Sequence, residues 1–277
     1  MRRFRSRAAG ATVLVALFAA GILVTLVGGA VAAERAVPLG AANGFAVLAG
    51  AGITNTGPTT IAGSLGTYPT KTIAGIASII GNGANHPGDA VARRAKTDLA
   101  AAYAAAAGEG PATPITADLG GQDLSPGVYA SASSIGLTGT LILDAHGNRS
   151  ARFVFQAGST LTTAPASQVR LVNGAQACNV YWQVAGSATL GTGYGFRGTI
   201  LAQDSITVNT GASVSGRLLA IRGAVTLSTS TIQRSTCGAD EKYTTRHTKP
   251  RPRTRHVGNC FSIRHRRYCV FAPPATG

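Results

Sequence analysis

A four-residue motif, Thr-Leu/Val-x-Thr, recurs along residues 160–229 and limits the folds open to this 277-residue chain. Its last three copies start at Thr189, Thr207 and Thr226, which are 18 and 19 residues apart. Further strand-like segments and glycine-containing corners recur between the copies. A repeat near 18 residues with short strands and glycine corners is typical of a β-solenoid whose coils have about three faces. The first copy starts at Thr160, 29 residues before the second, which predicts an insertion in that coil.

Alternation along a strand predicts which residues of each copy face solvent. The Leu or Val of the motif points into the solenoid, so the first Thr and the x residue point outward. Stacked coils then place the outward residues in two ranks, the first of Thr160, Thr189, Thr207 and Thr226 and the second of Thr162, Gly191, Asn209 and Ser228. The fourth residue of each copy lies at or near a corner, and its direction stays open. Residues 137–145 are expected to belong to an earlier coil.

One segment, from about Pro87 to Glu109, predicts a helix. Asn85 or His86 is the expected N-cap, and Pro87 suits the first turn. Helical spacing puts small and apolar side chains on one face: Val91, Ala95, Leu99, Ala102, Tyr103 and Ala106. Such a smooth face allows the helix to pack closely along another surface. The preceding residues, 37–83, alternate short apolar pieces with Gly, Thr, Asn and Pro, which predicts brief strands separated by turns.

The formal net charge of +15 lies mainly at the two ends of the chain. In residues 1–33, four arginines precede an apolar run and a small-residue stretch, the pattern of a secretory signal peptide. An uncleaved membrane anchor is the alternative, because the apolar run is close to the length of a short membrane span. Since residues 1–33 carry +4 and residues 238–277 carry +7, the main domain, residues 34–237, carries only +4.

Residues 238–277 form a Pro- and Arg-rich tail with nine Lys and Arg against two acids. We expect this tail to be flexible or extended. It is either a solvated appendage or a cationic segment that holds an exported protein near the anionic cell envelope. Nucleic acid would attract the same charges, but an export signal puts the protein in the wrong compartment, so no nucleic-acid partner is expected.

Four cysteines suit an exported protein in an oxidising compartment. Three pairings are possible, and we expect Cys178–Cys237, which brackets the repeats, with Cys260–Cys269, which closes a short basic loop. Zinc binding by the cysteines and nearby histidines is the alternative, but the chain has no Cys-x-x-Cys pair. No metal and no cofactor are therefore expected.

The acidic residues give no sign of a catalytic site. Parallel β-helices include enzymes that cleave polysaccharides with clustered carboxylates. Here Asp144 and Asp204 are isolated in sequence, and Asp118 and Asp123 precede the repeats. G-x-S-x-G, H-E-x-x-H and P-loop patterns do not occur in the sequence. We therefore expect no catalytic residues and no enzymatic activity.

The outward ranks of Thr, Ser and Asn have two interpretations. In the first, β-branched Thr simply suits strands and keeps a solenoid soluble. In the second, a regular and rigid array of hydroxyl and methyl groups orders water and matches a crystalline face, above all ice. Charged side chains would disturb such an array by holding their own hydration shells. The motif copies contain no charge, and their nearest charged neighbours are Asp204 and Arg222.

Residues 38–233 resemble the microbial ice-binding protein family. The resemblance lies in long phrases, including PLGAANGFAVLAGAGITNTGPTTIAGSLGTYP from residue 38, NGAQACNVYWQV from residue 173 and GTILAQDSITVNTGASVSGRLLAIRGAVTLSTSTI from residue 198. It implies a mainly β fold: a right-handed, discontinuous β-solenoid of triangular section with one long α-helix packed alongside. It also implies secretion and adsorption to ice through one flat solenoid face, which inhibits ice growth or recrystallisation.

The ice face of this family varies in sequence, so the candidate ice-binding residues come from the Thr ranks: Thr160, Thr162, Thr189, Thr207, Asn209, Thr226 and Ser228. The LAQD and LAIR strands, with Gln203 and Arg222 outward, are less suitable because these side chains are bulky or charged. We expect a monomer whose partner is an ice crystal surface. The alternative function is a structural or adhesive surface protein with the same solenoid, no enzymatic activity and no ice binding.

Overall fold

The computed structural model describes residues 37–238, 260–263 and 266–269. The chain divides into two compact units, residues 1–235 and 236–277, and each is described by itself. The expected signal peptide, residues 1–33, and most of the basic tail lie outside the described residues. Within the described ranges, no helix has both the length and the apolar character needed to cross a membrane.

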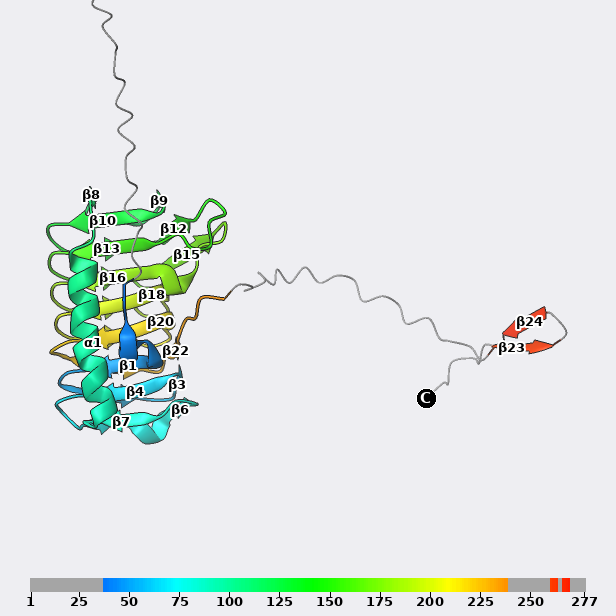
Figure 1. Cartoon of the computed structure of the whole chain (residues 1–277), viewed down its shortest axis with the longest axis horizontal. Coiled ribbons are helices and arrows are strands. Elements are labelled where there is room, and N and C mark those ends of the chain that lie inside the picture. The colour runs from blue at the N-terminus through cyan, green and yellow to red at the C-terminus, as the bar shows by residue number, and fades with distance from the viewer. Residues whose placement is uncertain (1–36, 239–259, 264–265, 270–277) are drawn as a thin grey trace, which may run out of the picture. The chain divides into compact units, whose positions relative to one another are not determined.

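The first unit is a solenoid of short strands that pair in parallel and stack coil upon coil (Figure 1). Its strands form a 15-stranded sheet, which bends round one corner of the coil, and a 7-stranded sheet. Together the two sheets give three faces, which we call the helix face, the mixed face and the Thr face. The predicted mainly β solenoid with about three faces is confirmed.

The helix face contains β1 (Phe45–Ala49), β4 (Ser64–Thr67), β7 (Asn85–Pro87), β8 (Thr113–Pro114), β10 (Gly127–Ser131), β13 (Phe153–Ala157), β16 (Val180–Val184) and the second halves of β18 (Gly195–Ala202) and β20 (Ser213–Ala220). The mixed face contains the first halves of β18 and β20 together with β3 (Thr59–Ala62), β6 (Ile79–Gly81), β9 (Asp123–Leu124), β12 (Thr140–Asp144), β15 (Gln168–Val172) and β22 (Thr231–Gln233). The Thr face contains β2 (Gly52–Thr56), β5 (Ile73–Ala74), β11 (Ile135–Leu137), β14 (Leu161–Thr163), β17 (Ala188–Leu190), β19 (Ile206–Val208) and β21 (Ala224–Ser228). Three short 3-10 helices join these strands: η1 (Gly40–Gly44), η2 (Ile76–Ser78) and η3 (Ala177–Asn179).

The corner between the helix face and the mixed face lies in the middle of β18 and β20. Gly198 of β18 pairs there with Gly216 of β20. Gly198 has a φ of +114°, and a Cβ at this position would lie 2.7 Å from the carbonyl oxygen of Val180. Only glycine accepts both the backbone angle and the close approach. The glycine corners predicted from the repeat are confirmed at this position.

The order of the coils in space differs from their order in the chain. β1 pairs with β20, β2 with β21 and β3 with β22, so the N-terminal strands extend the C-terminal end of the stack. Helix α1 (Ala90–Ala107) then runs along the helix face to the other end, where β8 and β10 begin the remaining coils (Figure 1). The solenoid is therefore discontinuous, as the resemblance implies.

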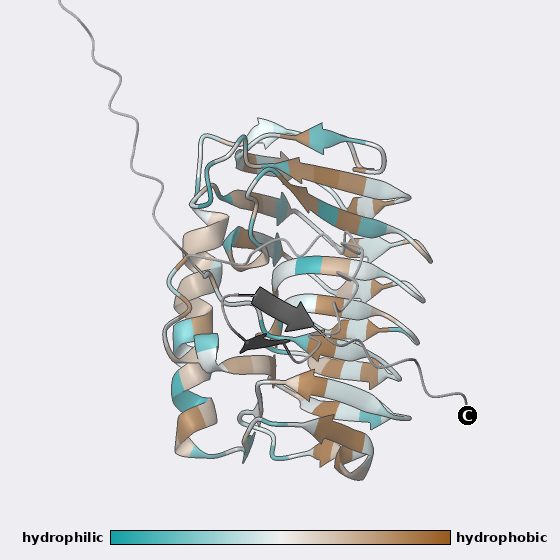
Figure 2. Cartoon of the chain, turned by 90° about the vertical axis from the view of Figure 1, so that its right-hand side faces the viewer, coloured by the Kyte–Doolittle hydropathy of each residue, from teal (hydrophilic) through white to brown (hydrophobic). Residues whose placement is uncertain are grey.

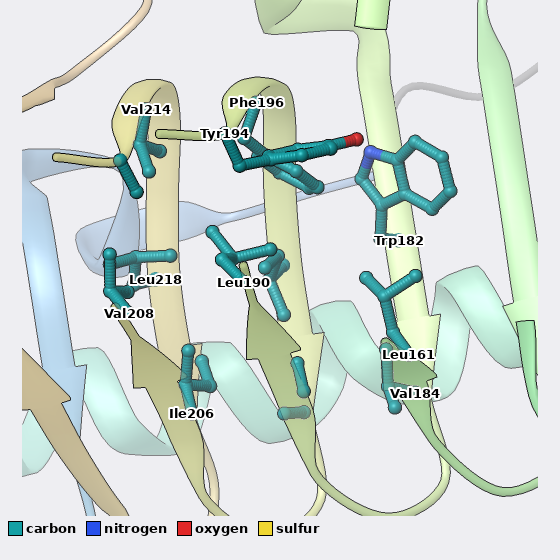
Figure 3. Close-up of a cluster of buried hydrophobic side chains, with 14 of the residues drawn as sticks. Leu161, Trp182, Val184, Leu190, Tyr194, Phe196, Ile206, Val208, Val214 and Leu218 are labelled. Atoms are coloured by element: carbon teal, nitrogen blue, oxygen red, sulfur yellow. The ribbon is translucent and has the colours of Figure 1, made fainter. Parts of the chain in front are cut away.

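The inside of the solenoid is a continuous stack of apolar side chains (Figure 3). The Leu or Val of all four motif copies belongs to it at 1% exposure or less: Leu161, Leu190, Val208 and Leu227. Their predicted inward direction is confirmed. Aromatic rings continue the stack from coil to coil, with the ring centroids of Phe155 and Trp182 4.0 Å apart.

Helix α1 covers the helix face with small side chains. Its buried residues pack against apolar side chains of β1, β13, β16, β18 and β20. Four of the residues predicted for this face are fully buried: Ala95, Leu99, Ala102 and Ala106. The fifth, Tyr103, is half-buried, and its hydroxyl accepts a hydrogen bond from Gln183 Nε2 at 2.7 Å. Val91 is a wrong prediction, because it lies at the edge of the buried stripe and is 49% exposed, while Ala92 is buried instead.

The predicted start of the helix is also wrong. Asp89, rather than Asn85 or His86, is the N-cap, and its Oδ1 accepts a hydrogen bond from the Ala92 backbone N–H at 2.8 Å. Asn85 and His86 instead lie in β7, which pairs with β4. Gly88, with a φ of +69°, makes the turn between this strand and the helix. Residues 85–87, predicted to cap and begin the helix, are therefore held in an extended strand by their pairing with β4.

The coil of the first motif copy carries the predicted insertion at residues 173–179, which includes η3. A second loop, at residues 145–152, follows β12 in the preceding coil. The two loops are in contact, since the Gly147 backbone N–H donates to the carbonyl oxygen of Asn173 at 2.8 Å. Gln176 Nε2 also donates to the carbonyl oxygen of Arg149 at 2.7 Å. β11 and β12 confirm that residues 137–145 belong to an earlier coil.

Cys178 and Cys237 are both disulfide-bonded, and the pairing between them stays a prediction. Cys260 and Cys269 are cross-strand partners in an antiparallel hairpin of β23 (Cys260–Ile263) and β24 (Arg266–Cys269). Cross-strand partners have Cα separations of about 4.5–5.5 Å, which a disulfide can bridge. This register supports the predicted Cys260–Cys269 bond, which also stays a prediction.

We expect Leu99→Ala to lower the free energy of unfolding by about 2–5 kcal/mol, because Leu99 is 0% exposed between α1 and the solenoid. Val91→Ala is the matched control on the same helix. Its side chain is 49% exposed, and we expect a change within about 0.5 kcal/mol. Urea unfolding followed by circular dichroism measures both, and equal effects would contradict the packing described for α1.

Lys96 on α1 donates through Nζ to the carbonyl oxygens of Ala220 and Ile221 at the end of β20. Burial lowers its pKa from 10.5 to about 8, so the unfolded chain holds the proton more tightly. The contribution of Lys96 to the free energy of unfolding therefore rises as the pH rises through this window. We expect the stability difference between wild type and Lys96→Met to shift in favour of wild type from pH 7.5 to pH 10 in urea unfolding, and a constant difference contradicts this.

Candidate functional site

The Thr face is a regular parallel sheet with the strand order β11-β14-β17-β19-β21-β2-β5. Its pairing register places one outward residue of each strand in a single line along the solenoid. This central rank consists of Gly136, Thr162, Thr189, Thr207, Thr226, Thr54 and Ala74. Five consecutive strands therefore present a Thr, and each step along the rank is about 4.8 Å.

Buried neighbours on both sides hold the central rank in place. Each rank residue follows an inward residue that is fully or largely buried: Ile135, Leu161, Ala188, Ile206, Val225, Ile53 and Ile73. Because side chains alternate across a strand, the rank residues must point away from the core. Thr54, Thr162 and Thr226 are exposed, and Thr189 and Thr207 are half-buried between their neighbours. Figure 2 shows the alternation of hydrophobic and hydrophilic residues along the stacked strands.

Thr160 does not join the rank of Thr189, Thr207 and Thr226, and this prediction is wrong. Leu161 pairs with Ala188, so Thr162 is the residue that lies beside Thr189. The prediction aligned the four copies by their motif, whereas the strand register follows the inward residues. In that register the first copy is displaced by two residues relative to the second. The insertion between these two copies conceals the displacement in the sequence. Thr162 accordingly belongs to the central rank and not to the second one.

Thr160 lies in a flanking rank on the side where the strands begin. Its Oγ1 donates to Ser134 Oγ of the preceding coil at 2.9 Å. Further along, the Ser205 backbone N–H donates to Ser187 Oγ at 3.3 Å. The Ala224 backbone N–H donates to Ser205 Oγ at 3.2 Å. The hydroxyls of this rank therefore bond neighbouring coils to one another.

Asn209 and Ser228 lie in a flanking rank on the other side, as predicted. Ser228 pairs with Thr56, and continuation of the same register puts Asn209 beside Ser228. Ser228 Oγ also lies 3.0 Å from Thr210 Oγ1. Gly191, predicted for this rank, occupies the matching position but is buried and offers no side chain.

The fourth residues of the motif, whose direction the sequence left open, divide into two groups. Thr163 is 3% exposed, and its Oγ1 accepts a hydrogen bond from the Gly191 backbone N–H at 2.9 Å. Thr192, Thr210 and Thr229 are exposed at the corner that follows the Thr face. Only the first copy therefore turns its last Thr into the core.

The seven strands of the Thr face contain no charged residue. The mixed face carries Arg170 and Arg197 on adjacent strands and Asp144 nearby, and the helix face is covered by α1. The LAQD and LAIR strands belong to this covered face. Gln203 and Arg222 follow them at the corner, where Arg222 Nη2 lies 3.1 Å from Asp204 Oδ1. This exposed ion pair marks the edge of the uncharged surface.

Thr54 is part of the central rank that the sequence prediction missed. It comes from the N-terminal segment and is placed beside Thr226 by the pairing of β2 with β21. The residues ITNT at 53–56 repeat the spacing of an inward residue, an outward Thr and a further outward Thr. That pattern could have identified the strand, but its position next to the last coil is not visible in the sequence.

Two acidic residues of the solenoid, Asp118 and Asp144, stabilise backbone turns by hydrogen bonds. Asp118 accepts a hydrogen bond from the Thr138 hydroxyl, and its Oδ1 also accepts from the backbone N–H groups of Gly120 and Thr138. These hydrogen bonds, that of the Thr138 hydroxyl above all, lower the pKa of Asp118. Asp144 accepts from the His146 backbone N–H and from Asn173 Nδ2, which lowers its pKa. Among the described residues, no group of three or more His, Cys, Asp or Glu could hold a metal ion.

The neighbours Thr162 and Thr163 give a matched test of the register. We expect Thr163→Val to lower the free energy of unfolding by about 1–3 kcal/mol, because the buried Gly191 N–H loses its acceptor. Thr162→Val makes the same chemical change on the exposed rank, and we expect an effect within about 0.5 kcal/mol. Urea unfolding compares the two, and a larger loss in Thr162→Val would contradict the register.

Known proteins share both the sequence and the fold of this solenoid. Residues 47–233 match the family described as Ice-binding-like. An ice-binding protein of Nostoc sp. (strain HG1) is 48% identical over 196 residues, which cover 70% of this chain and 72% of that protein. An ice-binding protein of Colwellia sp. is 36% identical over 224 residues, 74% of this chain and 86% of that protein.

Solved structures agree. The crystal structure of an ice-binding protein from an Antarctic biological consortium superposes with a TM-score of 0.72 and 45% identity, covering 73% of this chain and 93% of the other. That of an ice-binding protein from the ascomycete Antarctomyces psychrotrophicus gives 0.71 and 39%, covering 73% and 100%. With the discontinuous solenoid and flanking helix, these matches show that the chain belongs to the ice-binding protein family.

Proposed function

We propose that this protein adsorbs to ice through the Thr face and thereby inhibits ice growth or recrystallisation. Its membership of the ice-binding family supports the target. The observation that carries the choice of face is the central rank. Five consecutive strands present Thr on a face whose strands hold no charge and that no element of the described solenoid covers.

The Thr side chains suit this role because they are small, stiff and only weakly polar. A β-branched side chain has few χ1 rotamers, so binding orders little that is not already ordered. Each Thr offers a methyl group and a hydroxyl at a repeat of about 4.8 Å, which can hold water in a regular array. Ordered water on this array then merges with the ice lattice and pins the growth front.

The strand register supports a revised set of proposed ice-contacting residues. Thr162, Thr189, Thr207 and Thr226 form its centre, and Thr54 extends it by one strand. Asn209 and Ser228 flank the centre. Thr160 moves to the other edge, where its hydroxyl is engaged with Ser134, so its proposed role is to support the face.

The proposal extends to where and how the protein works. It acts outside the cell as a monomer, without enzymatic activity and without a cofactor, and its basic tail holds it near the anionic cell envelope. The turn-forming hydrogen bonds of Asp118 and Asp144 support a role without catalysis, since both carboxylates are engaged in shaping the backbone. The nine Lys and Arg of residues 238–277 support the envelope attachment.

We expect Thr207→Tyr to reduce partitioning into a growing ice crystal several-fold, because the bulky ring breaks the central rank. Thr231→Tyr is the matched control, since Thr231 is an exposed strand residue on the mixed face. It should partition like wild type, and circular dichroism should show both variants folded.

The two other outcomes of this experiment are distinct. If wild type is excluded from growing ice, ice adsorption fails and a structural or adhesive solenoid takes its place. If wild type partitions strongly and Thr207→Tyr does so equally, the protein binds ice through another face.

A further inference from the structure

The second unit contains a short antiparallel hairpin whose sequence is unlike that of the solenoid. β23 and β24 pair over four residues each, from Cys260 opposite Cys269 to Ile263 opposite Arg266. Only two residues separate the strands, and a basic run of Arg-His-Arg-Arg occupies positions 264–267. The hairpin strands therefore begin and end at a pair of opposed cysteines, and the sequence at their connection is basic.

The register divides the hairpin into two unlike faces. Directly opposite residues share a face, and consecutive residues alternate between faces. One face carries Phe261 with Tyr268 and Ile263 with Arg266. The other face carries Cys260 with Cys269 and Ser262 with Arg267. The register thus places Phe261, Tyr268 and Ile263 on the same face of the hairpin.

The charge of the tail indicates an anionic partner. Residues 238–277 carry a formal net charge of +7, whereas the main domain, residues 34–237, is about five times as long and carries only +4. A soluble anionic polymer would require charge alone. An aromatic pair next to an aliphatic residue fits a bilayer interface, where amphipathic rings lie at the level of the headgroups and basic residues attract anionic lipids.

We propose that the β23–β24 hairpin binds the interface of a bilayer that contains anionic phospholipid. Arg266 and Arg267 of β24 contact lipid phosphate, and the face with Phe261 and Tyr268 enters the headgroup region. The inference deepens the envelope attachment in the proposed function and rests on its location outside the cell. It is independent of the Thr face, because the hairpin and the solenoid lie in different units.

Flotation of the full chain with lipid vesicles tests the proposal. The vesicles contain either phosphatidylcholine alone or phosphatidylcholine with 30% phosphatidylglycerol, in low and high salt. We expect binding only to the anionic vesicles, weakened by salt. Soluble polyphosphate serves as the comparison ligand, because it offers phosphate charge without an interface.

Paired variants separate charge from insertion. Phe261→Thr/Tyr268→Thr should weaken vesicle binding about tenfold and leave polyphosphate binding unchanged, since it removes apolar burial but no charge. Arg266→Gln/Arg267→Gln should weaken vesicle binding about fivefold for each arginine and also weaken polyphosphate binding. Arg170→Gln/Arg197→Gln removes the same charge from the mixed face and should match wild type.

A fluorescent variant gives a second measurement that does not require loss of function. Phe261→Trp should show a blue-shifted emission with anionic vesicles and none with polyphosphate. The single native tryptophan, Trp182, is 1% exposed and supplies a constant background.

The proposal is overturned if the aromatic variant binds anionic vesicles as tightly as wild type, or if Phe261→Trp shows no shift on them. Either result would make the tail a plain polyanion-binding segment. Ice partitioning of every variant separates this failure from that of the proposed function. All variants should partition like wild type, and a chain that binds vesicles but not ice would contradict ice adsorption alone.

Discussion

Each coil of the solenoid is held to the next by parallel backbone hydrogen bonds, and the apolar side chains stacked inside set the register of those bonds. Leu161 above Ala188, and Ala188 above Ile206, leave one pairing in which every inward residue stays buried. A slip by one residue would turn the whole inward set to solvent. The line of Thr residues on the Thr face is a consequence of this register, because each of them lies next to a buried residue.

The burial of the inward side chains also explains how coils that are out of sequence order form one continuous stack. The N-terminal strands β1 and β2 complete the solenoid by pairing with β20 and β21 of the last coils. Arg217 helps to fix this junction. The residue is 2% exposed, and its guanidinium donates to the backbone and side-chain oxygens of Asn43 and to the carbonyl oxygen of Ser235. Burial, together with the nearby Arg234, lowers the pKa of Arg217 to about 10, so it remains charged at neutral pH.

Charge and surface function are separated along the chain. A face that orders water as a lattice cannot carry groups with strong hydration shells of their own, and the Thr face has none. Attachment to an anionic surface needs the opposite composition, and the basic residues are concentrated in the second unit. The division into two units lets one chain contain both compositions without either disturbing the other.

Local periodicity was sufficient to predict the solenoid, its inward Leu and Val residues and the Ala-rich face of the helix. These features depend on neighbours within one strand or one helix, and side-chain alternation and helical spacing encode them directly. The predicted start of the helix was wrong because residues 85–87 form β7 and pair with β4, so the helix begins only after Asp89. A strand pairing of that kind leaves no signal within the helix segment itself.

The sequence by itself determined the repeat, the uncharged composition of the Thr strands and the basic character of the tail. Only the tertiary structure decided which Thr residues form one line. Thr162 lies in β14 and Thr160 directly precedes that strand, and only the pairing of Leu161 with Ala188 assigns Thr162 to the central rank. Thr54 and Thr226 are far apart in the chain, and the closure of the discontinuous solenoid brings them together. Contacts between coils are non-local, so the spacing within a coil cannot fix them.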